Sequence, residues 1–123
     1  MIQTINAPDW PAFCQRINEH LVSARVKIET TAPDGIKNEL AANASLESMT
    51  FDGTDGCNNT ITVLVKDTRE VSHEIIEPIQ IRLRSSGGSG DFNTVEIEAE
   101  NGITIITLSP SIHPKVLAGL KLS

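Results

Sequence analysis

Three histidines and two cysteines are the side chains of this sequence best suited to metal binding or nucleophilic chemistry, but their spacing favours neither role. No two histidines form an H-x-H or H-x-x-x-H pair, and Cys14 and Cys57 belong to no C-x-x-C pair. Zinc sites are typically built from ligands paired in this way. We therefore expect no bound metal and no disulfide framework, with both thiols reduced as in cytosolic proteins.

Two glycine-rich stretches could hold an ion or a phosphate group. Residues 52–56, Asp-Gly-Thr-Asp-Gly, begin like a calcium loop, but Thr54, Gly56 and Val63 occupy its third, fifth and twelfth positions. The EF-hand pattern requires acidic or amide ligands at the third and fifth positions and glutamate at the twelfth. Residues 87–90 precede a predicted strand rather than a helix, so they match no phosphate-binding loop. The sequence thus predicts no cofactor.

An enzyme would need acid and base side chains that converge. Glu96, Glu98 and Glu100 share one face of a predicted strand, and such a row is typical of a solvated outer surface. A catalytic site would require His73 and nearby carboxylates to meet in a pocket. The sequence contains no G-x-S-x-G nucleophile motif either. We predict that the protein is not an enzyme and has no catalytic residue.

The net charge of −6 argues against binding to nucleic acids, because phosphate backbones attract clustered lysine and arginine. The best basic patch would combine Arg25 and Lys27 with Arg82 and Arg84. No aromatic residues lie among these four on which bases could stack. Nucleic-acid binding, as in Sm-like and SH3-like barrels, is therefore kept only as the alternative function.

An amphipathic helix is predicted at about residues 9–21. Asp9 is a suitable N-cap, and Pro11 fits the first turn, where a missing N–H costs little. The apolar residues recur at helical spacing: Trp10, Phe13, Cys14, Ile17 and Leu21. This apolar face should pack on a sheet.

From residue 22 the apolar residues alternate with polar ones, which predicts strands. The predicted strands cover about residues 22–30, 36–51, 60–66, 72–84, 93–100 and 103–108. Pro78 must lie at an edge, a bulge or an interruption, and a short helix is expected near residues 114–120. We predict one domain over residues 1–123, mostly β. The helix would pack on an antiparallel sheet of five to six strands, rolled or closed into a small SH3-like or Sm-like barrel.

The last predicted hairpin has a consequence for assembly. A two-residue Asn-Gly turn at 101–102 would pair Glu100 with Ile103 and Glu98 with Ile105. Ile103 and Ile105 would then lie on the glutamate face, and their strand would be apolar on both faces. Such strands are usually covered twice. The cover could be the N-terminal helix, the C-terminal segment or another subunit, so these two isoleucines are the candidate interface.

Several short segments, most of them structural signals, also carry a resemblance. They are Asp9-Trp10-Pro11-Ala12-Phe13, Pro33-Asp34-Gly35, Leu46-Glu47-Ser48-Met49, Ile61-Thr62-Val63, His73 before Pro78, Val95-Glu96-Ile97-Glu98-Ala99, Asn101-Gly102 and Ser109-Pro110. From about Ile5 to Leu117 the chain resembles a small, uncharacterised bacterial family, a domain of unknown function. The resemblance implies the fold but no activity and no site residues.

These observations favour a non-catalytic binding or assembly module that self-associates through strand 103–108, with an unknown protein partner. No apolar stretch approaches the roughly 18 residues that span a membrane. The first six residues lack the pattern of a signal peptide, so we expect a cytoplasmic protein. If the surface carries a site, the candidates are Trp10, His73, Arg82 and Arg84.

Overall fold

The computed structural model describes residues 2–54, 57–85 and 90–122. Parts of the two glycine-rich stretches, residues 55–56 and 87–89, lie outside these ranges. The described elements are β1 (Ile2–Ile5), the 3-10 turn η1 (Ala7–Asp9), α1 (Trp10–His20), β2 (Arg25–Thr31), β3 (Lys37–Thr54), β4 (Cys57–Lys66), β5 (Glu70–Ile76), β6 (Pro78–Arg84), β7 (Phe92–Ala99), β8 (Gly102–Ile112) and the 3-10 turn η2 (Pro114–Leu117).

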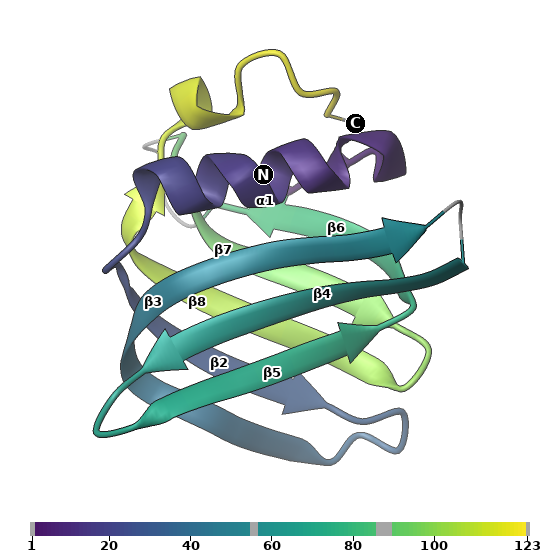
Figure 1. Cartoon of the computed structure of the whole chain (residues 1–123), viewed down its shortest axis with the longest axis vertical. Helices are drawn as coiled ribbons and strands as arrows, with labels where there is room; N and C mark the ends of the chain where they lie inside the picture. The colour runs from purple at the N-terminus through teal and green to yellow at the C-terminus, as the bar shows by residue number, and fades with distance from the viewer. Residues whose placement is uncertain (1, 55–56, 86–89, 123) are drawn as a thin grey trace.

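The eight strands of the described chain form one antiparallel sheet in the order β1-β6-β7-β8-β2-β3-β4-β5. Figure 1 shows the sheet curling so that β3, β4 and β5 lie in front of β7, β8 and β2, with α1 closing the upper side. The predicted mostly β fold, with an N-terminal helix and an antiparallel sheet, is confirmed. The expected five to six strands are wrong, and the sheet is open, with β1 and β5 as its two edges.

Two features account for the extra strands. The expected strand at 72–84 divides at Glu77, whose φ of 54° breaks the extended backbone between β5 and β6. Pro78 is buried at the start of β6, where a missing N–H is tolerated. The other addition is β1, which pairs with β6 far along the chain, Ile5 lying opposite Ile81.

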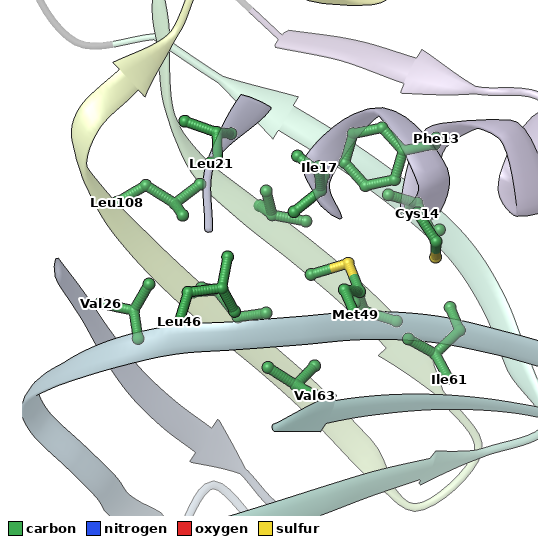
Figure 2. Packing of buried hydrophobic residues seen from close by; sticks show 14 of the residues in the cluster. Phe13, Cys14, Ile17, Leu21, Val26, Leu46, Met49, Ile61, Val63 and Leu108 are labelled. Atoms are coloured by element: carbon green, nitrogen blue, oxygen red, sulfur yellow. The ribbon is translucent and has the colours of Figure 1, made fainter. Parts of the chain in front are cut away.

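The apolar face of α1 packs into the concave side of the sheet, as its periodicity predicts. Phe13 and Ile17 are fully buried and lie above Leu46 and Met49 of β3 (Figure 2). Burying each such side chain contributes about 1.5–3 kcal/mol. Because the chain has only four aromatic residues, this core is mostly aliphatic.

Polar contacts fix α1 on the sheet. The side-chain amide of Asn18 accepts a hydrogen bond from the backbone N–H of Met49 at 2.7 Å and donates one to its carbonyl oxygen at 2.8 Å. The carboxylate of Asp9 accepts from the backbone N–H of Lys121 at 2.8 Å and makes no capping bond to its own helix. The expected capping role of Asp9 is therefore wrong, and the residue instead holds the C-terminal segment.

The β7–β8 hairpin forms where the sequence predicts it, but its register differs. Ala99 pairs with Gly102, so the two turn residues are Glu100 and Asn101 rather than the expected Asn-Gly pair. Gly102 has a φ of 139°, and a Cβ there would collide with the backbone oxygen of Thr31. The close approach of β2 thus requires glycine inside the ladder.

Candidate functional site: the free edge of β5

A hollow of about 190 Å³ lies where β5 faces the β7–β8 hairpin and the end of β2. In Figure 1 these segments lie on the side of the roll away from α1. Polar side chains are prominent in the lining, which includes Thr30, His73, Asn101 and Thr104. The lining contains no lysine or arginine.

The strand alternation of β5 brings His73 into this hollow. Val71, His73 and Ile75 face the interior, because the β4 residue opposite His73, Val63, is fully buried. His73 Nε2 lies 3.0 Å from the hydroxyl oxygen of Thr104 on β8, which is itself only 5% exposed. Burial lowers the pKa of His73 from its usual 6.5, because burial disfavours the charged imidazole. Burial therefore favours an uncharged imidazole beside the Thr104 hydroxyl.

This arrangement can exchange hydrogen bonds with a polar group through the imidazole and the hydroxyl. Glu74 also lines this hollow, but it is exposed, and strand alternation directs its side chain toward the outer face. Within the described ranges, no group of three His, Cys, Asp or Glu side chains is arranged to hold a metal ion. The buried Cys14 thiol has its pKa raised by burial to about 12, far from the thiolate needed for nucleophilic chemistry.

A second hollow, of about 250 Å³, lies beside the other end of β5. Leu40, Ala41 and Ala44 of β3 form one wall, and Val65 and Val71 form another. Residues 67–69, the turn between β4 and β5, form its polar rim. The two hollows thus flank one strand edge, which we call the β5 edge.

The β5 edge is a regular strand edge at the end of the sheet order. Its pairing with β4 runs without a shift from Thr60 opposite Ile76 to Lys66 opposite Glu70. The strand contains no proline, no lysine and no bulge, three of the devices that protect free edges, and its charged side chains are the exposed Glu70 and Glu74. In the described part of the chain, Glu70 and Glu74 on its outer face form no ion pair within 4.0 Å.

Arg82 and Arg84 occupy a different surface and are already paired. Both reach Glu96 of β7, at 2.6 Å for Arg82 Nη2 and 2.7 Å for Arg84 Nε, and Arg82 also lies 3.1 Å from Glu98. Burial opposes ionisation of Glu96, but hydrogen bonds from Arg84 and Arg82 and their positive charges outweigh it and hold its pKa below 4.5. Lys27, farther along the sheet, lies within 4.0 Å of two glutamates. Three of the four proposed cations are therefore already paired with glutamates.

Trp10 is not a surface residue, so the expectation that it marks a surface site is wrong. Its ring is 5% exposed, its indole N–H donates to the carbonyl of Ile5 at 3.0 Å, and its edge meets Phe51. The indole therefore anchors β1 to the helix. Of the four candidates, only His73 lies at the β5 edge, and the structure does not bring it together with the other three.

Ile103 and Ile105 lie on the outer face of the sheet, as expected. The altered hairpin register places Ile103 opposite Glu98 and Ile105 opposite Glu96, two residues from the expected partners. Because side chains alternate between faces with a period of two, this shift leaves both isoleucines on the outer face. Both are half-buried. Because α1 packs on the inner face, it does not cover them.

Thr104, Glu70 and Glu74 were not foreseen as site residues. Side-chain alternation in β8 puts Thr104 on the same inward face as Ile106. A polar residue on an otherwise apolar inward face could have been noticed in the sequence. The two glutamates carried no such signal, because only the strand order reveals that β5 is an edge.

These features define a rolled antiparallel sheet, closed on one side by a helix, with a free strand edge between two hollows. The chain belongs to the family of unknown function DUF5335, whose model matches residues 1–114. The resemblance to a family of unknown function is thereby confirmed. No curated protein and no solved structure matches the chain. Within the described residues, no helix has the length and apolar character needed to cross a membrane.

Proposed function

We propose that the protein is a non-catalytic binding module that takes up an extended polypeptide segment along the β5 edge. The observation that carries this proposal is a seven-residue edge strand with unbroken register and no proline, lysine or bulge. The backbone N–H and C=O groups on the open side of an edge strand can pair with a further strand. Domains that recognise peptides in this way gain affinity from the main chain and specificity from neighbouring pockets.

The two ends of the sheet differ in this respect. The opposite edge, β1, has four residues and is tied to α1 through the indole of Trp10. The β5 edge is longer and has one hollow beside Val71 and another beside His73 and Ile75. Alternate side chains of an added strand would therefore find space on the inner side along β5.

The test is a binding titration with a fluorescein-labelled peptide, Gly-Val-Lys-Asn-Thr-Leu-Lys-Val-Gly, followed by fluorescence anisotropy. The matched controls are two peptides of the same sequence with alternate backbone amides N-methylated. Each register of methylation removes the donors from one edge of the added strand. We expect saturable binding of the first peptide and at least tenfold weaker binding when the methylated edge is the one that faces β5. Equal affinity of the parent and both N-methylated registers, or no saturable binding of the parent, would overturn the proposal.

A second candidate function, self-association through strand 103–108, is favoured by the position of Ile103 and Ile105. Both side chains are partly exposed near the middle of the outer face. The neighbouring Glu96 and Glu98 are paired with Arg82 and Arg84, which lowers the cost of bringing a second surface close. A second copy of the chain would remove this apolar surface from water.

Light scattering coupled to size-exclusion chromatography tests this candidate. The double variant Ile103→Glu/Ile105→Glu should reduce the molar mass from that of a dimer to that of a monomer while the fold, measured by circular dichroism, is retained. Ile36→Glu, at a 59% exposed isoleucine in the β2–β3 turn, is the matched control and should leave the mass unchanged. A monomeric wild-type protein would exclude this candidate.

A further inference from the structure

We infer that the segment bound at the β5 edge carries two basic residues four positions apart, with a small polar and an apolar side chain between them. This inference rests on the proposed function and specifies its partner. It follows from the alternation of β5, which presents one row of side chains to solvent and the other to the interior.

The outer row selects the basic residues. Glu70 and Glu74 project from the outer face of β5, with Ser72 between them. A residue directly opposite each glutamate in an added strand would have its Cβ about 4.5–5.5 Å away, where opposite charges attract. Many of the other glutamates of the sheet, such as Glu96 and Glu29, already have cationic partners. The charge of the whole chain, −6, would also speed the approach of a basic segment.

The inner row selects the residues between them. The position opposite His73 faces the hollow of about 190 Å³, where the imidazole and the Thr104 hydroxyl can exchange hydrogen bonds with a small polar group. The position opposite Val71 faces the hollow of about 250 Å³, whose walls include Leu40 and Val65. That hollow suits an aliphatic side chain.

The two rows together give one pattern. Reading along the added strand, the residue opposite Glu74 is basic, the next is small and polar, the third faces solvent, the fourth is aliphatic and the fifth, opposite Glu70, is basic. The central residues of the test peptide, Lys-Asn-Thr-Leu-Lys, follow this order. The lack of lysine and arginine in the polar hollow argues against an acidic side chain at the second position, which would lose its hydration without gaining a cation.

Peptides that differ only at the two lysines test the outer row. We expect the glutamine version to bind at least threefold more weakly than the lysine version, and the glutamate version at least thirtyfold more weakly, at low salt. The protein variant Glu70→Lys/Glu74→Lys should reverse this order and prefer the glutamate peptide. Glu19→Lys is the control variant: it makes the same kind of charge reversal at one exposed position on α1. It should change the affinity for the peptides less than twofold.

The outcomes separate the inference from the proposed function. If the lysine, glutamine and glutamate peptides bind equally and N-methylation still weakens them, the inference is overturned and strand addition stands. If N-methylation has no effect in either register, strand addition itself fails.

For the inner row, replacing the peptide asparagine by leucine should weaken binding to the wild type at least fivefold. The same replacement should have less than twofold effect on Thr104→Val. An unchanged asparagine preference in that variant would overturn the inner-row assignment.

Discussion

His73 on β5 and Thr104 on β8 lie 3.0 Å apart, although three strands separate them in the sheet. The contact is possible only because the sheet rolls until its edge strand faces the β7–β8 hairpin. One hydrogen bond thereby connects a free edge to the middle of the sheet. It also places a neutral imidazole beside the hollow to which we assign ligand recognition.

The stability of the protein should depend on the protonation of His73. Burial lowers the pKa of His73 in the folded protein below 6.5, near which the unfolded chain titrates. Between the two pKa values the unfolded state binds more protons, so the free energy of unfolding falls as the pH drops through this window. His73→Gln keeps an amide able to bond Thr104 but cannot titrate. Urea unfolding at a series of pH values from 7.5 downward should show a smaller loss of unfolding free energy in the variant than in the wild type. Parallel pH dependences of the two proteins would contradict the role assigned to His73.

Removing the Glu96 carboxylate should be more costly than removing that of Glu98. The Glu96 side chain is 10% exposed and binds two arginines, whereas that of Glu98 is 37% exposed and binds one. We expect Glu96→Gln to lower the free energy of unfolding by about 1–3 kcal/mol and Glu98→Gln by less than about 1 kcal/mol. The Glu96 contribution is present above pH 4.5 and is lost as the pH falls through its lower folded pKa. Chemical unfolding at pH 7 and pH 3.5 measures both effects, and equal losses at pH 7 would be inconsistent with this ranking.

Asn18 should stabilise the protein through its two bonds to the backbone of Met49. Asn18→Ala leaves a partly buried N–H and C=O without these partners, so a loss of about 1–3 kcal/mol is expected. Gln15→Ala, one turn earlier on the exposed face of α1, should change stability by less than about 0.5 kcal/mol. Thermal and urea unfolding of both variants provide the comparison. A loss below that of the control would show that water replaces the Asn18 amide.

Gly102 should tolerate substitution less well than Gly35. Both have a positive φ, but a methyl group at Gly35 meets open space, whereas one at Gly102 collides with the backbone of Thr31. We expect Gly102→Ala to cost about 2–4 kcal/mol, from strain and overpacking together, and Gly35→Ala about 1 kcal/mol. Equal losses in urea unfolding would mean that β2 does not approach the hairpin as closely as the structure indicates.

The alternation of apolar residues was sufficient to predict the helix, most strands and the faces on which side chains lie. It predicted that Ile103 and Ile105 lie on the same face as Glu98. It could not reveal β1, because the pairing of Ile5 with Ile81 depends on residues far apart in the sequence. The prediction of the hairpin turn was wrong for a similar reason, because contact with Thr31 of β2 decides where Gly102 lies.

The candidate site was the least predictable feature. His73 was identified as a candidate, but its partner Thr104 lies 31 residues away and three strands across the sheet. Trp10 and Arg82 have types often found in binding sites, yet here each serves the fold. The role of Glu70 and Glu74 depends entirely on β5 being an edge, which is a property of the strand order.

The most direct test of the account is a titration of the ¹⁵N-labelled protein with the lysine peptide, followed by two-dimensional NMR of the backbone amides. Strand addition predicts that the largest shifts and the strongest gain in hydrogen-exchange protection fall on residues 71–75. Amides of β1 and of Ile105 should remain unchanged. Shifts centred on β1 or on the outer face around Ile105, with β5 unaffected, would contradict the proposal.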